Sequence, residues 1–404
     1  MPNAWIEIEG GVTSPAGFQA GAVNCGIRSK KPDVALLLSD RDAALAGAFT
    51  SNRLAAAPVA LCRERVARGQ ARAIIVNSGN ANAATGAQGI VDAERMAALT
   101  ADALGLSAAS VCVCSTGTIG VTLPMARLES GIRAVVSQLS SDGGPAAARA
   151  IMTTDLVPKE IALELTIEGK PVRIGGMAKG SGMIDPNLAT MLAYLTTDAA
   201  VESAALQACL LEAVQDSFNR ITVDGDESTN DTVLFMANGA AGNSPLQPGH
   251  AEWDCFVQAV REVCGRLARM IVKDGEGATK YVTVTVQGGA SDGEARQAAR
   301  AIANSLLVKT SWYGCDPNWG RVYDVVGYCG VSVDPNALEI KLDDHFAVRN
   351  GTVSTATDLK SLQAVLRQDE FTLLVDLHVG DGTDTVYTCD CSPEYVRINS
   401  EYTT

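Results

Sequence analysis

Histidine is scarce in this chain, as are aromatic residues, basic charge and long apolar runs. Only three of the 404 residues are histidine and 5% are aromatic, so Ala, Val, Leu and Ile must supply most of the core, as in many α/β proteins. The formal net charge of -14 argues against nucleic acid and anionic membranes as partners, because either requires a basic face. No apolar run reaches the roughly 18 residues of a membrane span, and the N-terminal MPNAWIEIEGG lacks the regions of a signal peptide. We therefore expect a cytoplasmic protein.

The cysteines and acidic residues offer no metal or cofactor site. The eleven cysteines lack C-x-x-C pairs, and several fall in apolar stretches such as SVCVCS (110–115), so we expect reduced and mostly buried thiols. The acidic segment VDGDESTND (223–231) fails the EF-hand spacing, because Glu227 and Ser228 stand where the next ligand and the turn glycine should fall. A solvated turn or a hydrogen-bonded active-site wall is the better interpretation of that segment. We expect no cofactor and no metal.

Strand and helix patterns alternate along the chain, which indicates an α/β protein. After the glycines at 288–289 the pattern changes and predicts a smaller C-terminal unit. We expect a main α/β domain over 1–285 and a C-terminal α/β domain over 286–404. Strands are predicted at 33–39, 71–79, 110–117, 190–199, 338–344 and 371–380, and helices at 92–105, 202–217, 251–271 and 293–306. The stretch KDGEGATKYVTVTVQGG (273–289) predicts a loop and then a strand of alternating Val and Thr.

The chain has no ordinary hydrolase or nucleotide-binding motif. His250, His345 and His378 lie near neither a G-x-S-x-G elbow nor a catalytic-cysteine signature, so surface or sheet positions explain them best. The glycine-rich KGSG (179–182) lacks the order of a phosphate-binding loop and leads into a predicted strand, which has no helix N-terminus to offer a phosphate.

Thr190 stands where the glycine- and proline-rich loop KGSGMIDPNLA (179–189) meets the predicted strand TMLAYLTTDA (190–199). A threonine at a chain N-terminus is a nucleophile that carries its own base, the α-amino group, whose usual pKa of about 7.7–8.0 leaves a neutral fraction near pH 7. Self-cleavage before Thr190 would create such a terminus. A loop that runs into a strand is common, however, so the local sequence permits this event without requiring it.

The same stretch, KGSGMIDPNLATML (179–192), resembles the processing site of the ornithine acetyltransferase family, the bifunctional glutamate N-acetyltransferases. Further blocks resemble the family in the family's order and span nearly the whole chain: VNSGNANAATG (76–86), CSTGTIGVTLPM (114–125), IMTTDLVPK (151–159), SFNRITVDGDESTNDTV (217–233), VKDGEGATK (272–280), LVKTSWYGCDPNWGRV (307–322) and YVRINSEYTT (395–404).

The resemblance implies a layered α/β sandwich of the type shared with self-processing aminopeptidases, and an acetyltransferase of arginine biosynthesis. The precursor would cleave between Ala189 and Thr190 into an α chain (1–189) and a β chain (190–404), associated as α2β2. Thr190 would take the acetyl group from N-acetyl-L-ornithine and pass it to L-glutamate; some members also use acetyl-CoA.

The resemblance also assigns roles to individual residues. Thr116 and Gly117 match the pair that forms the oxyanion hole, and a hydroxyl with a backbone N–H is a suitable donor set. Positions that match the family's substrate-binding residues are Thr153, Lys179, Thr190, Glu276, Asn399 and Thr404. Without the family, these residues would be interpreted as surface charges, a helix cap and a frayed C-terminus.

Four residues depart from the family pattern. Glu227 replaces an expected Thr, Cys315 replaces a more usual basic residue, and Asp324 and Cys329 are also untypical. They bear on fine specificity more than on the reaction. Two alternatives stay open at this point: a hydrolase on the same scaffold with water as acceptor, and an uncleaved amino-acid-binding protein without activity.

Overall fold

The computed structural model describes residues 5–185 and 191–401, which divide into two compact units. The first unit contains the described residues up to Asn219 together with Asp226–Ile271, and the second contains Arg220–Gly225 and the described residues from Val272 onward. The predicted boundary after residue 285 falls inside a strand, β10 (Tyr281–Gly289), and the two domains as predicted stay a prediction.

The first unit mixes strands and helices as the sequence predicts, but three strands follow one another at its start and three again in the middle of the chain. In chain order they are β1 (Trp5–Ile8), β2 (Phe18–Val23), β3 (Val34–Phe49), α1 (Ala57–Ala67), β4 (Gln70–Asn80), α2 (Gly86–Leu104), the 3-10 turn η1 (Ala108–Ser110), β5 (Val111–Thr118), α3 (Met125–Val136), α4 (Gly144–Ala150), β6 (Lys159–Ile167), β7 (Lys170–Lys179), β8 (Leu192–Thr197), α5 (Ser203–Gln215), the 3-10 turn η2 (Phe218–Arg220), β9 (Thr232–Ala237) and α6 (Trp253–Lys273).

One nine-stranded sheet of the described residues runs through the first unit in the order β1-β6-β7-β8-β9-β3-β4-β5, with β2 beside β3. The long strand β3 connects its two parts. The first part of β3 pairs with β2 and β4, its register shifts between Leu38 and Ala43, and its last residues pair with β9. A shift of this kind bends a strand, so β3 belongs to both parts of the sheet.

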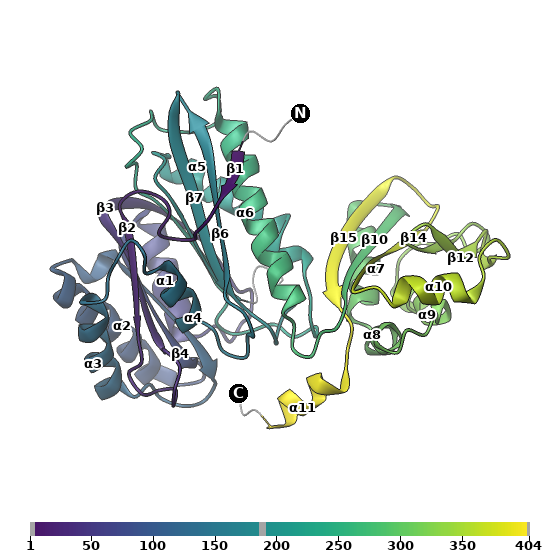
Figure 1. Ribbon diagram of the computed structural model, residues 1–404, viewed down its shortest axis with the longest axis horizontal. Helices are drawn as coiled ribbons and strands as arrows, with labels where there is room; N and C mark the ends of the chain where they lie inside the picture. The colour runs from purple at the N-terminus through teal and green to yellow at the C-terminus, as the bar shows by residue number, and fades with distance from the viewer. Residues whose placement is uncertain (1–4, 186–190, 402–404) are drawn as a thin grey trace. The chain divides into compact units, whose positions relative to one another are not determined.

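Helices pack against this sheet through two apolar cores. One core gathers residues of β3, β4, β5, β7, β8 and β9, with Tyr194 fully buried among them. A second core packs α1, α2 and α3 against β3, β4 and β5. Elsewhere Phe256 of α6 stacks on Phe235 of β9 at a ring distance of 6.5 Å. Figure 1 shows α2 and α3 along one outer side of this unit and α6 beside β6 and β7. The predicted α/β class is confirmed.

The second unit is a six-stranded sheet with its own core, in the order β13-β12-β11-β14-β10-β15 among the described residues. Helix α7 packs against β10 and β15. The elements that follow β10 are α7 (Asp292–Asn304), α8 (Leu306–Tyr313), α9 (Trp319–Tyr328), β11 (Glu339–Leu342), β12 (His345–Arg349), β13 (Thr352–Val353), α10 (Leu359–Leu366), β14 (Glu370–Asp376), β15 (Gly382–Cys389) and α11 (Pro393–Glu401).

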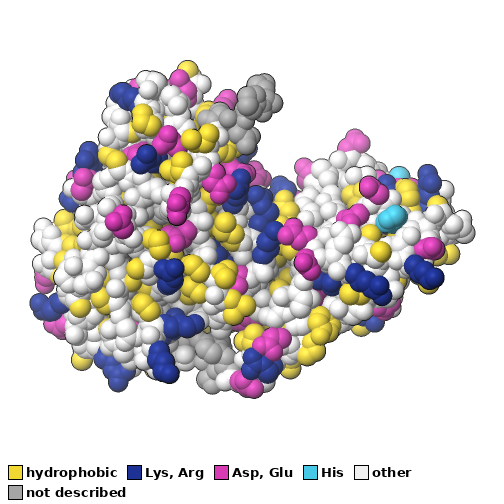
Figure 2. Space-filling model, viewed as in Figure 1, with side chains coloured by type: hydrophobic (Ala, Val, Ile, Leu, Met, Phe, Trp, Pro, Cys, Tyr) yellow, Lys and Arg dark blue, Asp and Glu magenta, His cyan; other side chains and the backbone are white. Residues whose placement is uncertain are grey.

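The surface and the thiols agree with an ordinary globular chain. On the face shown in Figure 2, acidic and basic side chains are interspersed. All eleven cysteines are free thiols, of which six are buried and five half-buried. Within residues 5–185 and 191–401, no helix combines the length and the apolar character that crossing a membrane requires.

Candidate active site

The predicted oxyanion pair lies at the end of β5, where this strand runs parallel to β4. Thr116 lies opposite Ser78, and Gly117 opposite Gly79. Gly117 has a φ of +132°, and a Cβ added there would lie 2.3 Å from the backbone carbon of Gly79. Only glycine fits a backbone conformation and an approach of this kind. The hydroxyl of Thr116 is nearly buried, with 9% of the residue exposed.

A set of buried amide side chains holds the ends of β4 and β5 in place. The Nδ2 of Asn77 donates to the carbonyl of Asn80 at 2.8 Å, and the hydroxyl of Ser115 donates to Oδ1 of Asn77 at 2.6 Å. From the loop before β9, Nδ2 of Asn230 donates to the carbonyl of Ser115 at 2.8 Å. Satisfied polar networks of this kind make a unique local structure. These three residues lie in family-like blocks, but no motif in the sequence marks them as site residues.

Lys179, the last residue of β7, lies beside the oxyanion pair. Its Nζ donates to Oγ1 of Thr116 at 3.5 Å, and only 8% of the lysine is exposed. Two predicted site residues 63 positions apart in sequence are therefore neighbours. The positive charge of this ammonium group also acts on the buried carboxyl group of Asp231 and lowers its pKa. Burial nevertheless raises the pKa of Asp231 well above its ordinary value, against hydrogen bonds from Ser228 and the charge of Lys179.

Thr153 lies in the loop between α4 and β6 and is half-buried. Its backbone N–H donates to Oδ2 of Asp155 at 3.0 Å, and its carbonyl accepts from the guanidinium of Arg28 at 3.1 Å. These bonds fix the backbone at Thr153 from two sides. The same Asp155 accepts from the N–H of Gly180, directly after Lys179, at 2.7 Å.

Glu276 and Asn399 come together within the second unit. Nδ2 of Asn399, on α11, donates to Oε2 of Glu276 at 2.7 Å. The loop that carries Glu276 is attached to the chain before α11, because the hydroxyl of Ser392 donates to the carbonyl of Gly277 at 2.6 Å. A Cβ on Gly277 would lie 2.6 Å from the backbone nitrogen of Tyr395, so glycine permits this close approach. Glu276 is 8% exposed and presents a buried acid that a cationic group can pair with.

Three predicted site residues, Ala189, Thr190 and Thr404, lie outside the described residues, and their roles stay predictions. The described chain resumes at Met191, whose carbonyl accepts from the N–H of Thr232 at 2.9 Å. From Leu192 onward, β8 lies between β7 and β9. The predicted strand after the loop is thus confirmed over Leu192–Thr197, and every residue of it is buried.

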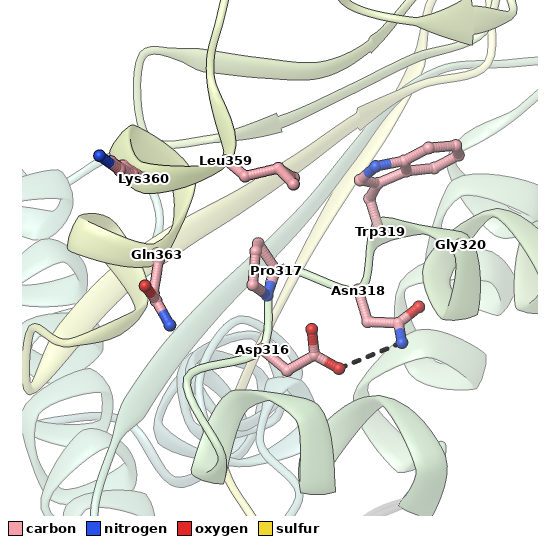
Figure 3. Close-up of a pocket in the computed structure, with 8 residues that line it drawn as sticks. All are labelled: Asp316, Pro317, Asn318, Trp319, Gly320, Leu359, Lys360 and Gln363. Atoms are coloured by element: carbon pink, nitrogen blue, oxygen red, sulfur yellow. Dashed lines mark hydrogen bonds between the residues drawn. The ribbon is translucent and has the colours of Figure 1, made fainter.

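The family departures lie mostly in the second unit, around α8 and α9. Cys315 adopts a φ of +51° and its Sγ donates to the carbonyl of Leu366 at 3.3 Å, while Asp324 is exposed and Cys329 half-buried. Glu227 is exposed in its loop. An open pocket of about 510 Å³ begins next to Cys315, and Figure 3 shows its lining side chains. The lining consists of Asp316, Pro317, Asn318, Trp319, Gly320, Leu359, Lys360 and Gln363, and it includes none of the predicted site residues.

This chain is similar to known proteins over almost its full length. The ArgJ family model matches residues 19–404. The arginine biosynthesis bifunctional protein ArgJ of Symbiobacterium thermophilum is 50% identical over 400 residues, which cover 98% of this chain and 99% of the relative. That of Geobacter sulfurreducens is 50% identical over 391 residues, covering 96% and 99%. The crystal structure of the same-named protein from Bacillus halodurans aligns with a TM-score of 0.51 and 42% identity, covering 53% of this chain and 100% of that one.

Proposed function

The chain belongs to the ArgJ family, and we propose that it transfers the acetyl group of N-acetyl-L-ornithine to L-glutamate through Thr190. The resemblance to the ornithine acetyltransferases is confirmed, and the chain is an acetyltransferase of arginine biosynthesis. The observation that carries the finer proposal is the 3.5 Å approach of the Lys179 ammonium to the Thr116 hydroxyl. It supports the proposal, in which Lys179 pairs with a substrate carboxylate and the neighbouring Thr116 donates to an oxyanion.

The first step proposed is cleavage of the precursor. The hydroxyl oxygen of Thr190 attacks the carbonyl carbon of Ala189, the peptide C–N bond breaks, and an ester forms. Water then hydrolyses the ester and leaves a carboxylate on Ala189 and a free α-amine on Thr190. This amine is the base that the hydroxyl of the same residue needs for its second task.

The second task is acetyl transfer in two half-reactions. The neutral α-amine of Thr190 takes the proton of its hydroxyl while the oxygen attacks the acetyl carbonyl of the donor. The hydroxyl of Thr116 and the N–H of Gly117 stabilise the oxyanion, and ornithine leaves with the proton. The amino group of glutamate then attacks the acetyl ester, which returns Thr190 to its starting state and releases N-acetyl-L-glutamate.

The remaining predicted residues recognise the amino acid itself. Lys179 would pair with its α-carboxylate, and Thr153 would line the same side. Glu276, held by the amide of Asn399 at 2.7 Å, is suited to a substrate amino group because a charged pair is strong where water is excluded. Thr404 completes the predicted set. Use of acetyl-CoA and an α2β2 assembly are further parts of the proposal.

Mass measurement under denaturing conditions tests the cleavage. We expect two species whose junction is Ala189/Thr190. From Thr190→Ala we expect one full-length inactive species, because the variant lacks the hydroxyl oxygen that performs both the cleavage and the acetyl transfer. A single uncut species from the unchanged sequence contradicts the proposal and favours the amino-acid-binding alternative.

The acceptor is tested by following ornithine release from N-acetyl-L-ornithine with and without L-glutamate. We expect release to depend on glutamate, since the acetyl-Thr190 ester otherwise accumulates once per enzyme molecule. Equal steady rates with and without glutamate contradict the transferase and identify water as the acceptor.

A further inference from the structure

Asp155, in the loop between α4 and β6, is a buried carboxylate with three donors. It is 2% exposed. Its Oδ1 accepts from Nζ of Lys159 at 2.7 Å and from the N–H of Gly180 at 2.7 Å, while its Oδ2 accepts from the N–H of Thr153 at 3.0 Å. A carboxylate bonded on both oxygens has one orientation, so its donors are held in fixed positions relative to each other.

The donors belong to two segments that are far apart in sequence. One is the loop at Thr153, which Arg28 also holds by donating to the carbonyls of Met152 and Thr153 at 2.6 and 3.1 Å. The other is the end of β7, where Gly180 directly follows Lys179. Asp155 therefore connects the two places from which Thr153 and Lys179 project.

The charges around Asp155 keep it ionised. Burial by itself raises its pKa, but the ammonium groups of Lys179 and Lys159 and the Gly180 N–H outweigh burial and lower the pKa to about 2. Lys159 is as buried as its partner, with 1% of its side chain exposed. Asp155 and Lys159 thus form a buried ion pair whose carboxylate also interacts with the charge of Lys179.

We propose that Asp155 is a positioning residue for the reaction: it holds the Thr153 loop and the Lys179–Gly180 turn at the spacing that an amino-acid substrate requires. The proposal rests on the proposed function, in which Thr153 and Lys179 bind that substrate. Among the described residues, Asp155 bonds to Thr153, Lys159 and Gly180, and we assign it no part in the bond making and breaking itself. Its loss should weaken the binding of substrate and transition state alike, which raises KM more than it lowers kcat.

Asp155→Asn tests this, with Asp198→Asn as the matched control. In Asp155→Asn one acceptor oxygen becomes an NH2 group, so at least one of the two backbone ties is lost. Asp198 is also buried, at 4% exposed, and also joins two segments, since it accepts from the N–H groups of Ala16 and Arg173 at 2.9 and 2.8 Å. None of its partners is a predicted site residue.

The readout is the KM and kcat of glutamate-dependent ornithine release, measured on protein whose cleaved fraction is known from its mass. We expect Asp155→Asn to raise KM for both amino acids roughly tenfold, with a smaller change in kcat, and Asp198→Asn to leave KM within about twofold of the unchanged enzyme. Equal kinetic effects of the two substitutions overturn the proposal.

A double variant covers the case in which Asp155→Asn does not fold because the buried ammonium group of Lys159 loses its counter-charge. Asp155→Asn with Lys159→Met removes both charges at similar volume, so we expect it to fold and to keep the raised KM. A double variant with both normal stability and normal KM overturns the positioning role, because the pair would then matter only for folding.

Binding separates this inference from the transferase proposal. Calorimetric titration of L-glutamate into Thr190→Ala protein, with and without Asp155→Asn, needs no turnover. We expect roughly tenfold weaker binding with Asp155→Asn, and this supports the positioning role even if glutamate-dependent release fails. Unchanged affinity, or no binding while Asp155 is present, overturns it.

Discussion

Two buried carboxyl groups near Lys179 have pKa values shifted in opposite directions because they differ in their donors. Asp155 accepts from three donors, two of them backbone N–H groups, and its pKa is about 2. Asp231 is equally buried at 2% exposed, but its Oδ2 has no hydrogen-bond partner among the described residues. Burial is therefore the largest influence on the pKa of Asp231 and raises it. An ionised carboxylate that loses its bound water needs hydrogen bonds from the protein in exchange.

Asp231 predicts a pH dependence of stability. An acid whose pKa is raised by folding keeps its proton better in the folded state, so the protein loses stability as the pH climbs above the ordinary value of 3.8. Asparagine has the same shape without the charge. We predict that Asp231→Asn raises the free energy of unfolding at pH 7 by about 1 kcal/mol or more, and that this gain shrinks toward pH 4.

Denaturant titrations at pH 4 and pH 7 on Thr190→Ala protein, which keeps one chain, measure this effect. The control is Asp155→Asn, for which the sign is opposite: a lowered pKa gives stability that is present above pH 4 and is lost as the pH falls toward 2. An Asp231→Asn protein less stable than its parent at pH 7 would contradict the assignment of burial as the governing cause.

At the scale of elements, the close approach of β4 and β5 decides the shape of the oxyanion site. The backbone of Gly117 passes so near Gly79 and Asn80 that a methyl group would lie 2.3 to 2.6 Å from backbone atoms. Backbone atoms cannot move aside as the end of a side chain can. An added methyl group must therefore displace the N–H of Gly117 from its place.

We predict that Gly117→Ala lowers kcat/KM for acetyl transfer by about 10²–10³, the usual cost of losing an oxyanion donor. The matched control is Gly120→Ala, directly after β5, which also has a positive φ, +81°, but open space around its Cβ position. Gly120→Ala introduces backbone strain but no clash with backbone atoms, so its kcat/KM should stay within a few-fold of that of the unchanged enzyme. Similar losses in both variants would show that strain, not the collision, is responsible.

The elements also show what the sequence could predict. The strands predicted at 71–79 and 110–117 match β4 and β5 within one residue at each end, because continuous apolar runs bounded by polar turns allow little else. The helix predicted to end at Gly105 does so, with a left-handed φ of +68°. Its true start at Gly86 was missed because two glycines interrupt the first turns.

The sequence did not predict the helices α8 and α9 as separate elements, because Gly314, Pro317 and Gly320 interrupt the pattern there. In the candidate site, periodicity could not bring Thr116 and Lys179 together, since it carries no distance between distant segments. The family resemblance named them both. Asp155 was passed over, and Asp231 was considered only as part of the acidic segment 223–231. The reason is that a buried charge looks like a surface charge in a sequence, and only its packing shows the difference.

For the whole molecule, the order of the sheet matters most. Strands β8 and β9 lie between β7 and β3. Cleavage at Ala189/Thr190 would assign β1 to β7 to the α chain and β8 and β9 to the β chain. The β chain would thus supply the middle of the nine-stranded sheet, whose two sides belong to the α chain, and neither fragment would hold all nine of these strands.

We predict that the two forms differ in refolding. Uncut Thr190→Ala protein should refold from denaturant with a yield that does not depend on protein concentration at low concentrations, because its strands meet within one chain. The cleaved protein should recover less and depend on concentration, since its fragments must first find each other. The measurement is the fraction of native fluorescence recovered after refolding at a series of protein concentrations. Equal yields for the cleaved and uncut forms would contradict this prediction.

The position of β8 and β9 inside the sheet finally implies an order of events for folding and the predicted cleavage. If the fragments build this sheet poorly, we expect the sheet to be complete before the peptide bond is broken. Cleavage would then mark irreversibly each molecule that has reached its native structure. Counting cleaved chains on a denaturing gel would score folding success molecule by molecule, and a substitution that impairs folding anywhere in the first unit would appear as uncut protein.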